Sequence, residues 1–253
     1  MPRNENPTTQ DERLELLTAR LTEQNRVRID ELSVEFSVSE MTIRRDLDEL
    51  QGRGLARRVR GGAVAVGAET FAARHRHNAR AKGRIAEKLA TLLPDTGTVA
   101  FDASSTVHRL ASQLDGARDL MVLTNGLDTF QVLHDKPGVS VALTGGEREP
   151  RTGSLVGPMA TRASGDLLFD VFMCSAAGID AELGASEASI AEAEVKRALA
   201  SASTRVVLAL DSSKLDSRAS GRAFRTDQIH TLVTELAPSD RRLAAYRDHY
   251  QLL

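Results

Sequence analysis

The chain of 253 residues contains a single cysteine and no tryptophan. One cysteine excludes an internal disulfide and any metal site built on several cysteines. Cys174 lies in an apolar run with Phe172 and Met173, which favours a buried structural role over a nucleophile. Aromatic residues make up only 4 % of the chain. Stacking platforms for single-stranded nucleic acid are therefore not expected.

Long hydrophobic runs are also absent. No segment approaches about 18 uninterrupted apolar residues, so we expect no membrane span. The opening residues, MPRNENPTTQ, lack the apolar segment of a secretion signal. We therefore expect a cytoplasmic protein. Hydrophobic residues make up 41 % of the chain, which is enough for a packed core, and the length predicts one to two domains.

The most informative segment, residues 37–62, reads SVSEMTIRRDLDELQGRGLARRVRGG. Apolar residues at helical spacing predict one buried face of a helix: Ile43, Leu47 and Leu50. The other faces carry polar side chains that can contact a partner: Thr42, Arg44, Arg45 and Asp48. Ser39 is placed to cap this helix, and a shorter amphipathic helix with Ile29, Leu32 and Phe36 precedes it. This layout is typical of a helix-turn-helix DNA reader.

The flanking residues support a DNA reader. Leu14, Leu17 and Leu21 predict an earlier covering helix. After Gly54, apolar and basic residues alternate through Arg60 and then reach two glycines, which predicts a two-stranded wing. Two helices and a turn occur in many proteins, and paired arginines are usually a solvated surface. The basic wing favours DNA because phosphate attraction depends on local charge, although the net charge is −2.

The segments SVSEMTIRRDL and ARRVRGGAV together resemble the N-terminal domain of the DeoR family of bacterial transcription regulators. The resemblance covers about residues 10–66 and implies a winged helix-turn-helix that binds double-stranded operator DNA. It implies contacts with DNA at Ser39, Met41, Thr42, Arg44, Arg45, Arg57, Arg58, Arg60, Gly61 and Gly62. The chain departs from the family at Arg28, which opens the second helix where a capping residue is usual. Asp30 and Glu31 are expected to offset the lost cap, worth ~1 kcal/mol, through the helix dipole.

Residues 67–79 are expected to form a linker, followed by a second domain over residues 80–253. His75 and His77 lie among arginines without a third ligand nearby, so a solvated basic linker is favoured over a metal pair. Beyond the linker, predicted strands alternate with predicted helices, which indicates an α/β domain with a mainly parallel sheet. The expected strands are 98–101, 120–123, 139–143, 171–174, 205–210 and 230–233. The expected helices are 106–114, 127–134, 156–168, 188–201 and 240–249, after a first one that contains Ile85, Leu89, Leu92 and Leu93 and ends at Pro94.

Small polar and charged residues follow the predicted strands, and ligands of open α/β sheets bind at the carboxyl ends of the strands. Ser104, Ser105 and Thr106 open a helix and form a natural anion site, and Lys214 adds a charge suited to phosphate. Three acids are candidate acceptors for sugar hydroxyls: Asp102, Asp180 and Asp211. Polar residues after strands are often only turn formers. Five such loops on one sheet edge nevertheless favour a site for a small phosphorylated polyol.

The motifs TNG, LTGG, AAGID and LDSSK resemble, in this order, the C-terminal effector domain of the DeoR family over about residues 80–240. The resemblance implies a fold related to ribose-5-phosphate isomerase and a sugar-phosphate effector. It implies effector contacts at Asp102, Ser104, Ser105, Thr106, Asn125, Gly126, Gly145, Gly146, Asp180, Lys196 and Lys214. The family commonly has glycine and then threonine where this chain has Ser104 and Ser105. The added Cβ narrows the approach of the backbone to an anion.

The leading hypothesis is a sugar-phosphate-responsive transcription regulator, most often a repressor in this family, of a carbohydrate operon. No catalytic residue, metal or cofactor is expected. A homo-oligomer, dimer or tetramer, is expected because one winged helix covers few base pairs. A second hypothesis is an isomerase-like enzyme with Glu187, Glu192 or Glu194 as its base, although the Lys-Gly-Gly run of such isomerases is missing. A third is a DNA-bound scaffold with a degenerate pocket.

Overall fold

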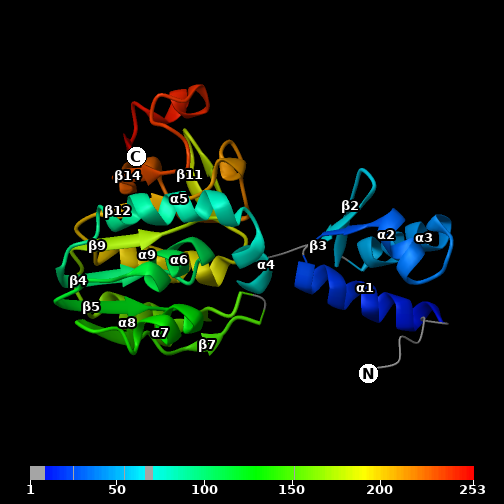
Figure 1. The fold of residues 1–253 in the computed structure, drawn as a ribbon, viewed down its shortest axis with the longest axis horizontal. Helices are drawn as coiled ribbons and strands as arrows, with labels where there is room; N and C mark the ends of the chain where they lie inside the picture. The colour runs from blue at the N-terminus through cyan, green and yellow to red at the C-terminus, as the bar shows by residue number, and fades with distance from the viewer. Residues whose placement is uncertain (1–8, 25, 54, 66–70, 151) are drawn as a thin grey trace. The chain divides into compact units, whose positions relative to one another are not determined.

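The structure, a computed structural model, describes residues 9–24, 26–53, 55–65, 71–150 and 152–253. The chain divides into two compact units, Met1–Arg74 and His75–Leu253. Each unit has its own apolar core, and Figure 1 shows the two units with labels on many of their helices and strands. In the described ranges, no helix is long and apolar enough to cross a membrane.

The first unit is a winged helix-turn-helix. Its helices are α1 (Gln10–Gln24), α2 (Ile29–Glu35) and α3 (Glu40–Gly52). The predicted wing is the antiparallel pair of β2 (Ala56–Val59) and β3 (Gly62–Ala65). Sequence analysis did not predict β1 (Arg26–Arg28), which pairs with β3 as a third strand.

The predicted helix faces of this unit are confirmed. The leucines of α1 and the apolar face of α3 are at most 4 % exposed: Leu14, Leu17, Leu21, Ile43, Leu47 and Leu50. A polar contact that the apolar pattern did not reveal joins the same two helices. Arg13 Nε lies 2.7 Å from Asp46 Oδ2, and Asp46 is 1 % exposed. The angle between α1 and α3 is therefore fixed by both apolar packing and an ion pair.

The helix ends follow the sequence reading. Ser39 Oγ accepts a hydrogen bond from the Thr42 amide at 3.1 Å, as expected for the cap of α3. Arg28 opens α2 and provides no side-chain cap. Instead, its guanidinium lies 2.5 Å from Asp30 in the first turn and lowers the pKa of that carboxyl to about 2.

The second unit contains a parallel sheet, as predicted. In its described part, seven strands are ordered β15-β14-β12-β9-β4-β5-β6, and every neighbouring pair is parallel. The strands are β4 (Thr96–Phe101), β5 (Asp119–Thr124), β6 (Val139–Leu143), β9 (Val171–Cys174), β12 (Val206–Ala209), β14 (Thr231–Val233) and β15 (Gln251–Leu252).

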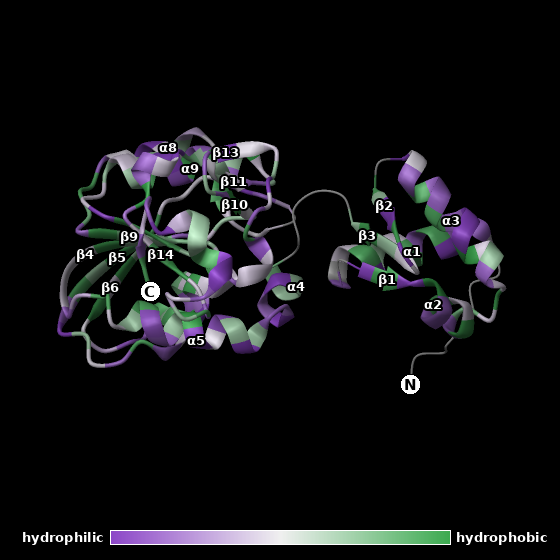
Figure 2. Ribbon diagram, turned by 90° about the horizontal axis from the view of Figure 1, so that it is seen from above, coloured by the Kyte–Doolittle hydropathy of each residue, from purple (hydrophilic) through white to green (hydrophobic). Residues whose placement is uncertain are grey.

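Helices cover both faces of this sheet. One core contains residues of α5 (Ala79–Ala90), α6 (Ser105–Gln113) and α7 (Leu127–Leu133), and the other contains residues of α8 (Pro158–Gly165) and α9 (Ile190–Ser201). Figure 2 shows the strands between α5 on one side and α8 and α9 on the other. Successive strand residues enter opposite cores, as Val99 and Ala100 do. Burial on both faces explains the continuous apolar strand sequences.

Two small antiparallel sheets were not predicted. One contains β10 (Gly178–Asp180), β11 (Gly184–Glu187) and β13 (Gly221–Phe224), and the other pairs β7 (Glu147–Arg148) with β8 (Leu155–Val156). The 3₁₀ segments are η1 (Ser212–Lys214), η2 (Thr226–Gln228) and η3 (Arg241–Tyr246).

Two predicted helices differ in extent or type. The helix expected over 156–168 is only α8, because Val156 belongs to β8 and Gly157 has φ +88°. The segment expected as a helix over 240–249 contains the 3₁₀ helix η3. Its buried residues, Leu243 and Tyr246, are three apart, which suits three residues per turn.

The expected linker contains a helix, α4 (Phe71–Arg76), while residues 67–70 lie outside the described ranges. We predicted a solvated His75, but its side chain is only partly exposed. Its ring lies edge-on to that of His108 on α6, at 5.3 Å between centroids. Burial lowers the pKa of both histidines. Arg109 and Lys82 lower that of His75 further, and His75 lowers that of His108. His77 is exposed, as predicted.

This histidine pair predicts acid sensitivity of the second unit. Below pH 6.5 the unfolded chain takes up protons at both positions more readily than the folded chain does. The free energy of unfolding therefore falls as the pH decreases from 7 to 5. Urea unfolding at the two pH values measures the loss, and His108→Gln should reduce it. The exposed His77→Gln serves as the control, and an equal effect of both variants would contradict this origin of the acid sensitivity.

Gly62 is required for the third strand of the wing. A Cβ at Gly62 would lie 1.9 Å from the Val27 carbonyl oxygen, whereas nothing lies within 4 Å of one at the neighbouring Gly61. Gly61 has φ +79°, so alanine there costs only backbone strain, about 1 kcal/mol. We predict that Gly62→Ala lowers the melting temperature of the first unit far more than Gly61→Ala. Equal shifts in calorimetry would show that the contact between β1 and β3 does not limit this position.

Candidate functional site

The exposed face of α3 carries the predicted DNA contacts. Met41 is 60 % exposed, and Arg44 and Arg45 are exposed as well. Arg44 Nη2 lies 3.0 Å from Glu40 Oε2, one helical turn earlier. Arg45 has no carboxylate partner within the described residues. Among the described residues of this face, Arg45 is therefore the cation without an ion pair, while Arg44 would have to exchange Glu40 for a DNA group.

The three wing arginines are not equivalent. Arg57 and Arg60 are exposed and make no ion pair in the part of the chain that the structure describes. Arg58 Nη1 instead donates to Asp48 Oδ1 at 2.8 Å and to the Arg44 carbonyl oxygen at 3.0 Å. Its backbone amide donates to Gln51 Oε1 at 3.0 Å.

These contacts give Arg58 a structural role that the sequence analysis did not predict. The resemblance implies a DNA contact at Arg58; in the structure its guanidinium attaches β2 to α3, and only 25 % of its side chain is exposed. Gly62 was also expected at the DNA surface, and it is buried against β1. Gly61 remains at the exposed tip of the wing.

Salt dependence separates the two kinds of wing arginine. Arg57→Ala should remove one phosphate contact and reduce the slope of log K against log [salt] by about 0.9. Arg58→Ala should weaken DNA binding through a displaced wing while leaving that slope nearly unchanged. Fluorescence anisotropy titrations of duplex DNA at several salt concentrations measure both. A slope reduced equally by the two substitutions would mean that Arg58 contacts phosphate after all.

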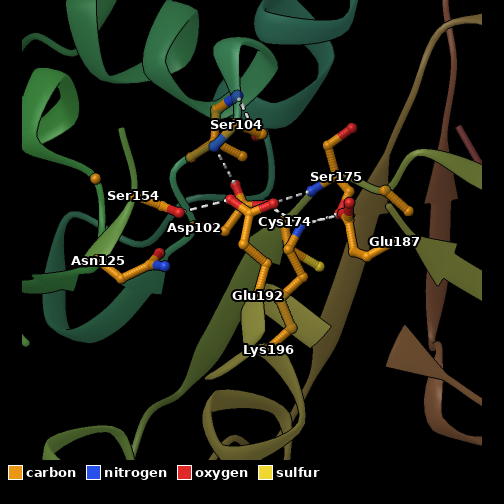
Figure 3. Close-up of polar contacts among 12 residues, drawn as sticks. Asp102, Ser104, Asn125, Ser154, Cys174, Ser175, Glu187, Glu192 and Lys196 are labelled. Atoms are coloured by element: carbon orange, nitrogen blue, oxygen red, sulfur yellow. Dashed lines mark hydrogen bonds and ion pairs between the residues drawn. The ribbon is translucent and has the colours of Figure 1, made fainter. Parts of the chain in front are cut away.

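In the second unit, loops that follow the parallel strands bring polar side chains together (Figure 3). Asp102 follows β4 and is completely buried. Its Oδ1 accepts a hydrogen bond from the Ser104 amide at 3.1 Å, and its Oδ2 accepts one from the Ser175 amide at 2.9 Å. The predicted sugar acceptor is thus already used to fix the loops after β4 and β9.

Lys196 on α9 completes this network. Its ammonium donates to Asp102 Oδ2 at 2.7 Å, to the Ser175 carbonyl oxygen at 2.6 Å and to Glu187 Oε1 at 2.7 Å. Burial by itself would lower the pKa of Lys196, but the two carboxylates raise it well above its ordinary value. An ammonium has three hydrogens, and all three are used. Lys196, predicted as an effector ligand, therefore acts as a positioning residue in this structure.

The start of α6 has the properties expected of an anion site. Ser104 Oγ caps the helix by accepting from the Val107 amide at 3.2 Å. The amides of Ser105 and Thr106, in the first turn, have no acceptor among the described residues. Free amides and the helix dipole both favour a bound anion at this position.

The loop after β5 packs directly against the start of that helix. A Cβ at Gly126 would lie 2.9 Å from the Ala103 Cα atom, so only glycine fits here. Asn125 Nδ2 donates to the Leu155 carbonyl oxygen at 3.1 Å. Asn125 is 2 % exposed, and its Oδ1 has no partner in the described part of the chain.

Other predicted residues have different surroundings. Asp180 lies in β10, outside the parallel sheet, where it accepts from two turn amides and pairs with Arg218 at 2.7 Å. It therefore forms a turn rather than a strand end of the main sheet. Lys214 Nζ donates to the Ala176 carbonyl oxygen at 2.7 Å. Gly145 and Gly146 have φ +67° and +110°, which explains why glycine occupies both positions in the turn after β6.

The first acid of α9, Glu192, was considered only as a catalytic base, and Ser154 was missed. Ser154 Oγ donates to Glu192 Oε1 at 2.7 Å, and both side chains are buried. The spacing of Glu192 and Lys196, four residues on one helix, is the signal that would have shown them side by side. The other candidate bases are an exposed Glu194 and the paired Glu187. Cys174 is buried as predicted, and burial raises the pKa of its thiol.

Comparison with known families agrees with this geometry. Residues 13–68 match the DeoR-like helix-turn-helix domain, and residues 77–236 match the DeoR C terminal sensor domain. The chain belongs to the DeoR family. It is accordingly a DNA-binding transcription regulator and not an enzyme, and we call its second unit the sensor unit.

Curated relatives cover nearly the whole chain. The HTH-type transcriptional regulator GolR of Listeria innocua is 35 % identical over 85 % of this chain and 86 % of its own length. The transcriptional repressor AccR of Agrobacterium fabrum is 33 % identical over 90 % of both chains. The glycerol-3-phosphate regulon repressor of Escherichia coli is 29 % identical over 90 % of this chain and 92 % of its own.

Solved structures resemble the chain more distantly. eIF2B beta from Chaetomium thermophilum covers 68 % of this chain and 54 % of its own, with a TM-score of 0.44 and 15 % identity. Ribose 5-phosphate isomerase A from Methanocaldococcus jannaschii covers 55 % of both chains, with a TM-score of 0.41 and 12 % identity.

Proposed function

We propose that this regulator represses a carbohydrate operon and that a phosphorylated sugar in the sensor unit controls its affinity for operator DNA. The observation that carries the proposal is the start of α6, where the Ser105 and Thr106 amides are free of acceptors in the described residues. A phosphate has the charge and the acceptor oxygens that such a helix start favours. Lys214 adds a positive charge in the loop after β12.

The names of the relatives support this choice of ligand class and operon. They include a glycerol-3-phosphate regulon repressor, a putative aga operon repressor and an L-fucose operon activator. Both directions of control occur among them. Repression is proposed here because more of these names describe repressors, and a homodimer or tetramer on repeated half-sites is proposed with it.

A proline substitution tests the anion site without breaking the helix. Ser105 is the first residue of α6, where proline is well tolerated, and Ser104 already has the extended backbone that precedes a proline. Ser105→Pro removes the amide hydrogen and the hydroxyl, while Ser105→Ala removes only the hydroxyl. We predict that Ser105→Pro lowers the affinity for a sugar phosphate at least tenfold more than Ser105→Ala does.

The readouts are thermal shift for effector binding and anisotropy for operator binding, with an operator selected from random duplex DNA by the wild-type protein. A ligand at ~100 times its Kd should stabilise the wild type by ~2.7 kcal/mol. It should also change operator affinity by about 5- to 150-fold. Both variants should bind operator normally without ligand. A panel of sugar phosphates that neither stabilises the protein nor changes operator affinity would contradict the proposal.

A further inference from the structure

Buried polar atoms without partners occur in the loops after β5 and β9, close to the Asp102 network. In the described part of the chain, Asn125 Oδ1 and Ser175 Oγ have none, nor does Thr129 Oγ1 on α7, and each of these side chains is at most 2 % exposed. A buried polar atom left unpaired costs about 1–3 kcal/mol, so such a group calls for a partner outside the chain. Figure 3 shows the Asn125 amide pointing toward Glu192 and Asp102.

These atoms offer a ligand hydrogen-bond acceptors and hydroxyls but no positive charge. The amide nitrogen of Asn125 is used by the Leu155 carbonyl, so the atom that remains for a ligand is an acceptor. The serine and threonine hydroxyls both donate and accept. The one buried cation here, Lys196, has all three hydrogens occupied within the described network. No hydrogen of Lys196 is therefore left for an anionic group of a ligand.

The charges of these side chains also favour a hydroxyl of the ligand over an anionic group. Asp102 and Glu187 share the single positive charge of Lys196, which leaves a surplus carboxylate in a buried setting. A third acidic side chain, Glu192, lies beside them and accepts from Ser154. A second anion brought into this environment meets repulsion in a low dielectric, whereas a hydroxyl finds acceptors for its hydrogen.

We propose that the sensor site discriminates between hydroxyl and carboxylate at the end of the effector remote from its phosphate. It accepts an alditol or neutral sugar phosphate, whose terminal hydroxyl donates to Asn125 Oδ1, and rejects the corresponding aldonate phosphate. The proposal rests on the proposed function, because the phosphate at the start of α6 sets the orientation of the ligand. Asn125, Ser175 and Glu187 are the residues that determine this specificity.

Matched probes test the discrimination on the full-length protein. Each pair differs only in a terminal CH₂OH or carboxylate: glycerol 3-phosphate and 3-phosphoglycerate, ribitol 5-phosphate and 5-phosphoribonate, glucitol 6-phosphate and 6-phosphogluconate. Isothermal titration should show the hydroxyl member binding at least tenfold tighter in every pair that binds. A carboxylate member that binds as tightly would overturn the specificity and leave the proposed function intact. No binding by any pair would refute both.

Two variants locate the effect. Glu187→Gln removes the surplus charge and should shrink the preference for the hydroxyl member at least fivefold. The exposed Glu87→Gln on α5 makes the same change of charge and should leave the preference unchanged. Ser175→Ala removes a hydroxyl that has no partner among the described residues. It should therefore keep the thermal stability of the unliganded protein while weakening the binding of the hydroxyl member. Unchanged affinities in both site variants would overturn the assignment.

Discussion

One buried ammonium group connects the parts from which the sensor site is built. Lys196 on α9 binds the carboxylate after β4, the carbonyl after β9 and the carboxylate at the end of β11. It thereby joins the parallel sheet to the small antiparallel one. Removing one member of such a buried pair typically costs about 3–5 kcal/mol, because the remaining charges stay buried without compensation. The loops of the site can therefore hold their positions only while this network is intact.

Stability alone does not explain such a network. Replacing a buried ion pair by well-packed apolar residues is often neutral or stabilising. The same strand ends also keep unpaired polar atoms at Asn125 and Ser175, which lowers stability further. Both costs occur at the carboxyl edge of the sheet, where ligands of open α/β folds bind. Among the described residues, the two cores that cover the faces of the sheet are built from apolar side chains instead.

The sequence was most informative where a property depends on neighbours along the chain. The spacing of Ile43, Leu47 and Leu50 predicted the buried face of α3, and the apolar runs predicted the parallel strands. Contacts between distant residues left no such pattern. Asp102 and Lys196 are 94 positions apart, and neither position indicates the other. Arg57 and Arg58 are adjacent and chemically identical, so alternation along a strand predicts opposite faces without showing which one meets α3.

The pairing state of a cation is a better guide to its function than its residue type. On the winged domain, Arg45, Arg57 and Arg60 lack ion pairs in the described residues, while Arg58 is bound to Asp48. In the sensor unit, Lys196 is fully occupied, while the amides at the start of α6 are free of acceptors there. An anion gains most from donors that give up no existing partner, because exchanging one partner for another has little net benefit. By this argument we propose that DNA phosphate binds at the free arginines, and that the effector's phosphate binds at the start of α6 rather than at the buried lysine.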